Sequence, residues 1–325
     1  MRGNEAPSDG VTAYMWERLG NQLFVWAAAL AQATRLGCPC YANLSVFHSK
    51  RPKRDYTKMF ALESFDHGMT IVGDPKEHKQ LFLGYPAVAP ATFWHNQVRP
   101  NLPWLAQSAP VFMEAAFQYD IRVNTIVPGT TMLGLFQSWR YFASIDAEIR
   151  GRMADLKNPS AWFSEASARL VPGAGSIVLN VRRGDYLMPT NQRVIGLTTR
   201  EYYAEALALL RACGLNGTVY VASDSLDDAM RELRGLGALS PIEVPAGTDP
   251  FEILVLLSRA DGFVAANSSF SWWAGYLGTR PGRPVIAPRP WFTDSSVDDR
   301  DLLPGSWLTL GRDASAFTQA IAPAA

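Results

Sequence analysis

The chain is poor in the residues that build disulfide frameworks and protein-held metal centres. It has three cysteines, Cys38, Cys40 and Cys213, an odd number with one close pair. This usage is typical of a reduced intracellular protein without a disulfide framework. The four histidines all lie in the first half of the chain and show no metal-ligand spacing among themselves or with the cysteines. We therefore expect no protein-held zinc and assign no metal-binding residue.

Net charge and long apolar runs are also lacking. The 30 basic and 30 acidic residues balance, so a surface held to nucleic acid or to an anionic membrane by bulk charge is not expected. The apolar run at residues 23–31 is shorter than the ~20 residues of a membrane span, and residues 1–10 lack the hydrophobic segment of a signal peptide. We expect a cytoplasmic protein without a transmembrane segment. Peripheral contact with the inner membrane stays open, and the sequence does not predict the oligomeric state.

The pattern of strands and helices predicts an α/β fold in two domains. At 325 residues the chain exceeds the usual size of one domain. From Ser176 onward, strand and helix signals alternate with short connections, which is typical of a doubly wound parallel sheet. We expect strands at 177–181, 218–222, 242–244, 262–266 and 284–287 and helices at 202–213, 225–236, 251–260 and 268–277, with Thr198 and Glu201 as a capping box before the first helix.

The first half of the chain shows the same theme more loosely. We expect a strand at 12–16, a turn at 17–22, a helix at 23–36 and a strand at 39–42, followed by strands at 70–72 and 132–136 and helical structure at 142–168 with a break at Pro159. Residues 50–130 are rich in proline and aromatic residues and show weak periodicity. The predicted domains are residues 11–172 and residues 173–312.

The most informative segment runs a buried strand directly into two arginines. Residues 177–181 are almost entirely apolar, and Arg182 and Arg183 follow at once. Ligands of open α/β sheets bind outside the carboxyl ends of the strands, and the planar fork of an arginine matches phosphate. A phosphorylated ligand is the first hypothesis. The alternative is an arginine pair bound to Asp185 or to a neighbouring helix.

Two other strand-to-helix turns carry related signals. Residues 266–273 put several small hydroxyl residues at a helix N-terminus, where backbone N–H groups and the helix dipole favour an anion such as a diphosphate. The alternative is ordinary N-capping by Ser268 or Ser269. Residues 17–24 contain a glycine before a helix, for which the alternative is a simple tight turn. None of the three segments is specific alone.

In order, the segments resemble the α-1,2-fucosyltransferase family. The matching sequences are Arg18-Leu-Gly-Asn-Gln22, Asn180-Val-Arg-Arg-Gly-Asp-Tyr186, Ala222-Ser-Asp224 and Asn267-Ser-Ser-Phe-Ser-Trp-Trp273. The resemblance extends from about Tyr14 to Leu310 and includes the pair Tyr202-Tyr203. It implies a GT-B-like enzyme of two Rossmann-type domains facing a cleft, with residues 11–172 on the acceptor side and residues 173–312 binding GDP-fucose. Its reaction would be inverting transfer of L-fucose from GDP-β-L-fucose to an oligosaccharide or glycolipid acceptor, at the 2-hydroxyl of a β-galactoside, with no cofactor and no metal.

The resemblance also implies roles for individual residues. Arg182 would hold the β-phosphate of the leaving GDP, Ser268 and Ser269 would lie against the diphosphate, and Asp224 would face the guanine. Arg183 is assigned to the fold. The expected catalytic residues are Arg182, Asn21 and, as general base, Glu17. The expected donor-binding residues are Arg18, Gly20, Asn180, Arg182, Ser223, Asp224, Asn267, Ser268, Ser269 and Phe270.

The sequence departs from the family pattern at two positions. Asn180 replaces the usual histidine, so this side chain can form hydrogen bonds but carries no charge. Glu17 replaces the usual glycine and brings a carboxylate to the expected site, where the alternative to a general base is a solvent-facing turn residue. Asp185 is the other carboxylate near the expected site, and the alternative is that it pairs with Arg183. The Asp299-Arg-Asp301 sequence has the D-x-D pattern of a metal site, but we expect it to form a solvated turn.

Two competing functions remain. The first is a non-catalytic nucleotide-sugar or glycan-binding protein in which Asn180 marks a decayed site, against which stands the retention of Arg182, Asp224 and the Asn267 turn. The second is a nicotinamide-dependent oxidoreductase. It is disfavoured because no Gly-x-Gly-x-x-Gly turn follows any expected strand.

Overall fold

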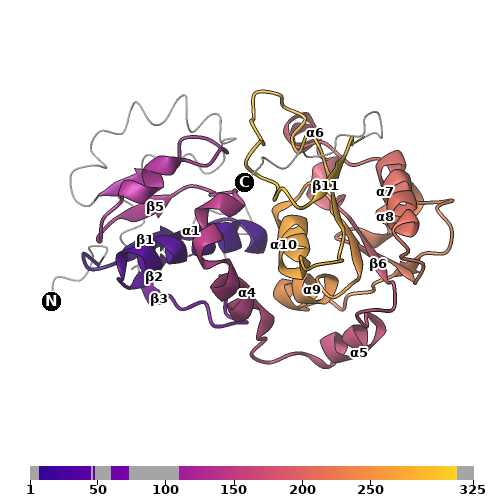
Figure 1. Cartoon of the computed structure of the whole chain (residues 1–325), viewed down its shortest axis with the longest axis horizontal. Helices are drawn as coiled ribbons and strands as arrows, with labels where there is room; N and C mark the ends of the chain where they lie inside the picture. The colour runs from indigo at the N-terminus through magenta and orange to yellow at the C-terminus, as the bar shows by residue number, and fades with distance from the viewer. Residues whose placement is uncertain (1–6, 45–46, 48–59, 73–109, 313–325) are drawn as a thin grey trace. The chain divides into compact units, whose positions relative to one another are not determined.

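The computed structural model describes residues 7–44, 47, 60–72 and 110–312. The chain divides into two compact units, Met1–Asp155 with Ser296–Leu302, and Leu156–Ser295 with Leu303–Ala325. Each unit contains one parallel sheet (Figure 1). The predicted α/β class with two Rossmann-type domains is confirmed.

The first unit has a five-stranded sheet in the order β3-β2-β1-β5-β4. Its strand order reverses between β1 and β5, which makes this pair the switch point where ligands bind in such sheets. Helix α1 follows β1, is buried along most of its length and ends at Gly37, whose φ is 63°. The strands are β1 (Val11–Tyr14), β2 (Cys40–Asn43), β3 (Thr70–Val72), β4 (Val111–Met113) and β5 (Thr131–Leu133), and the helices are α1 (Leu19–Leu36), η6 (Ile121–Thr125), η7 (Trp139–Tyr141), η8 (Ala143–Ile145) and α4 (Asp146–Ala154).

The start of α1 corrects the sequence prediction. Residues 19–22 were expected in a turn but form the first turn of the helix. Leu19, Gly20 and Gln22 are buried. Strand β4 was not predicted, and most of the weakly periodic region lies outside the described residues.

The second unit has a six-stranded sheet in the order β11-β10-β9-β6-β7-β8. Counted from β6, this is the strand order of the Rossmann fold, with the switch point between β6 and β9. Helices α7 and α8 lie on one side of β6, and α9 and α10 lie on the other (Figure 1). The strands are β6 (Ile177–Val181), β7 (Val219–Ser223), β8 (Ser240–Pro241), β9 (Gly262–Val264), β10 (Val285–Pro288) and β11 (Leu308–Leu310), and the helices are α5 (Ala161–Arg169), η9 (Gly184–Leu187), α6 (Pro189–Val194), α7 (Arg200–Ala212), α8 (Leu226–Glu232), α9 (Pro250–Leu257) and α10 (Ser269–Gly278).

Several predicted boundaries in this unit differ from the structure. The cap of α7 is Thr199, because the Thr198 hydroxyl instead forms a 2.8 Å hydrogen bond with the Tyr203 hydroxyl. Strand β8 lies before the expected 242–244 segment, α8 ends four residues early, and β11 was not predicted.

The units divide at Asp155 and not at residue 172. The reason is that Glu252 of α9 accepts hydrogen bonds from the backbone N–H and hydroxyl of Ser160, both at 2.6 Å, which holds α5 to the second unit.

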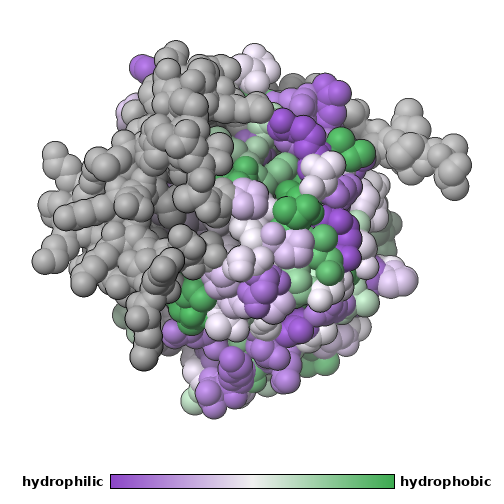
Figure 2. Space-filling view, turned by 90° about the vertical axis from the view of Figure 1, so that its left-hand side faces the viewer, coloured by the Kyte–Doolittle hydropathy of each residue, from purple (hydrophilic) through white to green (hydrophobic). Residues whose placement is uncertain are grey.

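Figure 2 shows one face of the molecule. Hydrophilic and weakly polar residues cover most of its coloured surface, and the hydrophobic residues lie in small groups. Among the helices that the structure describes, none is both long enough and apolar enough to span a bilayer.

Candidate functional site

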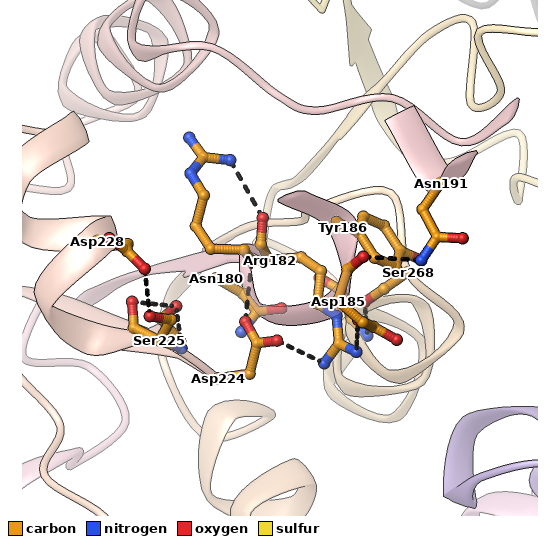
Figure 3. A network of polar contacts seen from close by, with 12 residues as sticks. Asn180, Arg182, Asp185, Tyr186, Asn191, Asp224, Ser225, Asp228 and Ser268 are labelled. Atoms are coloured by element: carbon orange, nitrogen blue, oxygen red, sulfur yellow. Dashed lines mark hydrogen bonds and ion pairs between the residues drawn. The ribbon is translucent and has the colours of Figure 1, made fainter. Parts of the chain in front are cut away.

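Three neighbouring strands of the second unit end beside one another. Strands β7, β6 and β9 are adjacent and parallel. Arg182 follows β6 directly, Asp224 follows β7 directly, and Ser268 caps the helix that follows β9. Three of the predicted segments are thereby brought to one edge of one sheet, at its switch point (Figure 3).

Arg182 lies at the centre of this edge. Its Nη1 lies 3.0 Å from Asp224 Oδ2, its Nη2 lies 2.5 Å from Asp185 Oδ1, and its guanidinium carbon lies 5.1 Å from the centre of the Tyr186 ring (Figure 3). Asp185 is therefore a partner of Arg182 and not, as considered from the sequence, of Arg183. The Arg182 Nε is buried and has no acceptor among the described residues. Two carboxylates and a ring thus orient the guanidinium, and its Nε–H has no partner among the described residues.

Asp224 is held by two contacts within the protein. Its Oδ1 accepts a 2.9 Å hydrogen bond from the Arg183 backbone N–H, and its Oδ2 pairs with Arg182. The carboxylate lies so close to Gly184 that an added Cβ there would fall 2.1 Å from Oδ2. Both oxygens are engaged in this way, whereas the family resemblance placed Asp224 opposite the guanine.

Arg183 points into the unit. It is 4% exposed and donates to the carbonyls of Thr198 at 3.0 Å and Arg182 at 3.1 Å. Its Nη2 also lies 3.5 Å from Glu232 Oε2. These contacts give Arg183 a structural role, because they tie the end of β6 to α8 and to the start of α7.

The strand ends are fixed by two tyrosines of α7. The Tyr203 hydroxyl donates to the Asn180 carbonyl at 2.9 Å, and the Tyr202 hydroxyl donates to the Ala265 carbonyl at 2.7 Å. Burial raises the pKa of both tyrosines, so they remain protonated donors. In the sequence analysis this pair appears only as part of the resemblance, and its role in fixing the strand ends was not predicted. The Asn180 amide donates to the Ala222 carbonyl at 3.2 Å, so it links β6 to β7.

The turn between β9 and α10 uses its polar side chains for its own structure. Asn267 is 1% exposed, and its amide donates to the carbonyls of Ile195 at 2.8 Å and Gly196 at 3.1 Å. The Ser268 hydroxyl accepts from the Ser271 N–H at 3.2 Å and caps α10, as the alternative interpretation proposed. What this turn offers a ligand is therefore the helix N-terminus, where Ser269 and Phe270 occupy the first turn. Ser223 closes the neighbouring turn by hydrogen bonds with the backbone of Ser225.

The other predicted site residues lie in the first unit, in the connection between β1 and α1. Glu17 has φ 65°, a left-handed conformation in which glycine is comfortable and glutamate is strained. Arg18 is exposed at the N-cap position, and Gly20 is buried in the first turn. Asn21 Oδ1 accepts a 2.8 Å hydrogen bond from Gln137 of the segment after β5. These residues occupy the switch point of their own sheet, and their predicted meeting with Arg182 across a cleft stays a prediction.

In the D-x-D sequence Asp299-Arg-Asp301, the second aspartate contacts other residues of the protein. Asp301 pairs with Arg140 at 2.8 Å and accepts from the Tyr119 backbone N–H at 3.1 Å, so it is not a fully solvated turn residue. In the part of the chain that the structure describes, no group of three or more His, Cys, Asp or Glu residues is arranged to hold a metal ion.

A family model confirms the resemblance. The model of glycosyl transferase family 11 matches residues 132–307, which is more than half of the chain. The protein belongs to glycosyl transferase family 11, a fucosyltransferase family, and is a glycosyltransferase.

Curated relatives and solved structures are similar along most of the chain. The α-1,2-colitosyltransferase of Escherichia coli is 26% identical over 305 residues, covering 92% of this chain and 98% of the relative. The O-antigen biosynthesis glycosyltransferase WbnK of Escherichia coli is 27% identical over 314 residues, covering 90% and 97%. The NodZ α-1,6-fucosyltransferase soaked with GDP-fucose has TM-score 0.47 and 16% identity over 83% of this chain and 92% of its own. POFUT1 in complex with GDP-fucose has TM-score 0.45 and 14% identity over 87% and 99%.

Proposed function

We propose that this glycosyltransferase moves L-fucose from GDP-β-L-fucose to the 2-hydroxyl of a β-galactoside in an oligosaccharide or glycolipid, with inversion at the anomeric carbon. The observation that carries the proposal is the oriented Arg182 at the switch point of the second unit, with its buried Nε–H unpartnered among the described residues. This is where a nucleotide diphosphate binds in a Rossmann-type sheet.

Arg182 has the chemistry to stabilise departure of GDP. When the anomeric C–O bond breaks, negative charge grows on the β-phosphate, and a fixed guanidinium is most useful at that moment. Asp185 and Asp224 fix the guanidinium before the donor arrives, so little reorganisation is needed in the transition state. The N-terminus of α10, capped by Ser268, would supply backbone donors to the same diphosphate.

The first unit would act on the acceptor and the sugar. In this proposal the Glu17 carboxylate takes the proton of the acceptor hydroxyl. At the same time the oxygen of that hydroxyl attacks the anomeric carbon of the donor, the anomeric C–O bond breaks and GDP leaves. The strained φ of 65° at Glu17 supports a functional role, because strained residues cluster at active sites. Asn21, held by Gln137, would contact the sugar or the phosphate.

The proposal includes no metal and no cofactor. The diphosphate contacts assigned here are a guanidinium and helix N-terminal N–H groups, which can offset the charge that a divalent cation would otherwise neutralise.

A second candidate differs only in the donor sugar. The Escherichia coli relative with 26% identity is named an α-1,2-colitosyltransferase, which favours a colitosyl donor as the alternative to a fucosyl donor. The proposed roles of Arg182 and α10 are the same for both, because these groups would contact the diphosphate and not the sugar.

The test is to incubate the full chain with GDP-fucose, or with the corresponding colitosyl donor, and a set of β-galactosides, and to determine the product linkage by NMR. We expect an α-1,2-linked product from one donor. Arg182→Lys is the control. It keeps the charge but loses the fork, so its kcat should fall on the order of a hundredfold. Binding of GDP without transfer or donor hydrolysis would instead support the non-catalytic alternative.

A further inference from the structure

Glu114 is a buried acid that the proposed reaction does not use. It follows β4 directly and is 6% exposed. Its Oε2 accepts two backbone hydrogen bonds, from Leu135 N–H and Phe136 N–H, both at 2.8 Å. The Glu114 carboxylate is thus placed against the turn that follows β5, on the edge of the sheet that carries Glu17 and Asn21.

The turn after β5 is strained and closely fitted to this side chain. Phe136 has φ 51°, a left-handed conformation that costs a non-glycine residue free energy and persists only where its surroundings fix it. At Gly134 an added Cβ would lie 2.6 Å from Glu114 Cβ and 2.8 Å from Oε2. Glu114 therefore requires a glycine at one end of the turn and holds the strained residue at the other.

The same turn contacts the β1–α1 connection at both of its ends. The Gly134 carbonyl accepts a 2.9 Å hydrogen bond from Trp16 Nε1, and Gln137 Nε2 donates to Asn21 Oδ1 at 2.8 Å. Trp16 and Asn21 flank Glu17 and Arg18 in the sequence. Any shift of the turn would thus be passed to the proposed base and to its neighbours.

We infer that Glu114 is a positioning residue: by holding residues 134–137, it sets the geometry of the Trp16–Asn21 segment at the switch point of the first unit. The inference rests on the proposed function for its catalytic meaning. Glu114 has no role in proton transfer to the substrate here, because it lies beneath the turn and its Oε2 is engaged.

Glu114 positions the turn through the oxygen that accepts the two hydrogen bonds, and not through its negative charge. Burial raises the pKa of Glu114 to about 7, although the two backbone hydrogen bonds from Phe136 and Leu135 lower it, so the side chain is partly neutral near neutral pH. Both backbone donors meet the same oxygen. A glutamine offers one carbonyl oxygen at that place and should substitute for the glutamate.

The experiment compares Glu114→Ala with the matched variant Glu114→Gln in the full chain. Glu114→Ala loses two backbone hydrogen bonds, so kcat should fall on the order of tenfold or more while GDP affinity stays unchanged. Glu114→Gln should keep kcat within about threefold. Gln137→Leu should lower kcat similarly, and the Glu114→Ala/Gln137→Leu double variant should be no worse than the poorer single variant, since both break one chain of contacts.

Hydrogen exchange by mass spectrometry provides a readout that does not depend on activity. In Glu114→Ala, peptides covering residues 134–138 and 16–22 should exchange faster than in the wild type and in Glu114→Gln. If the wild type transfers no sugar, the proposed function fails, and the exchange data alone judge the inference. Unchanged exchange in Glu114→Ala overturns it. So does a full kcat in a Glu114→Ala protein that has only a lower melting temperature, because Glu114 would then be purely structural.

Discussion

The close approach of Gly184 to Asp224 leads to a sharp prediction for Gly184→Ala. The added methyl group would lie 2.1 Å from Asp224 Oδ2 and 3.0 Å from its Cγ. A carboxylate at the end of a flexible side chain could normally turn away. Here it is held by Arg183 N–H on one oxygen and by Arg182 on the other, so relief of the clash must break at least one of these contacts.

The magnitude follows from the contacts that are lost. A hydrogen bond to a charged acceptor contributes about 1.5–3 kcal/mol. The ion pair with Arg182, whose two side chains are 21% and 25% exposed, is partly screened and adds up to about 1 kcal/mol. We expect Gly184→Ala to lower the stability of the unit by about 1–4 kcal/mol, the upper value applying if both contacts are lost. Activity should also fall, since Arg182 loses one of the two carboxylates that orient it.

The assay is thermal unfolding of a double-mutant cycle with Asp224→Ala. Once the carboxylate is removed, the alanine at position 184 meets no obstacle, so Gly184→Ala should cost little in that background. Gly151→Ala is the matched control. It lies in α4, its added Cβ has no atom within 4 Å, and it should be neutral or stabilise by about 0.5–1 kcal/mol. An equal loss from Gly184→Ala with and without Asp224 would refute the steric reasoning.

Four further predictions concern the same units. Arg183→Lys should lower the melting temperature but leave kcat per folded molecule nearly unchanged, because Arg183 donates to buried carbonyls; a stable but inactive variant would contradict this. Asn180→His should keep activity and add a titration around pH 6–7 to the rate profile, and an unchanged profile would place residue 180 outside the working site. Transfer activity should persist in EDTA, and complete loss restored by Mg²⁺ or Mn²⁺ would count against the metal-free proposal. The folded-state pKa of Glu114, about 7, lies above its ordinary value of 4.5, so unfolding free energy should fall as pH rises between these values. Glu114→Gln should abolish that slope, and a wild-type unfolding curve without it would show that the carboxyl is not raised.

The second unit was largely predictable because its signals are local. Buried strands such as residues 177–181 read as apolar runs, and the polar residues that end them carried the resemblance. Asp249 caps α9 by accepting from the Phe251 N–H at 2.9 Å, as its sequence before Pro250 indicates. Errors arose where a tertiary contact decides. The Thr198 hydroxyl is taken by Tyr203, which leaves the capping to Thr199.

The contacts between site residues were beyond the sequence. Arg182 could have paired with a ligand, with Asp185 or with Asp224, and only the fold shows that it contacts both acids. Glu114 was missed because three half-buried residues, 111–113, give a weak strand signal. The signal that could have found it is a lone acid directly after an apolar triplet. The left-handed φ of Glu17 was not predicted either, although a glycine, which the family usually has at that position, adopts such a conformation readily.

The charges around Arg182 indicate that it stabilises the transition state more than the bound donor. Asp185 and Asp224 already neutralise the guanidinium, so a ground-state diphosphate gains little net attraction from it and must compete with two carboxylates. Charge that develops later on the leaving phosphate strengthens the interaction with a guanidinium that is already in place. The loss in Arg182→Lys should therefore fall on kcat far more than on KM for the donor. Equal loss in GDP affinity and in kcat/KM, with kcat unchanged, would show instead that Arg182 serves ground-state binding.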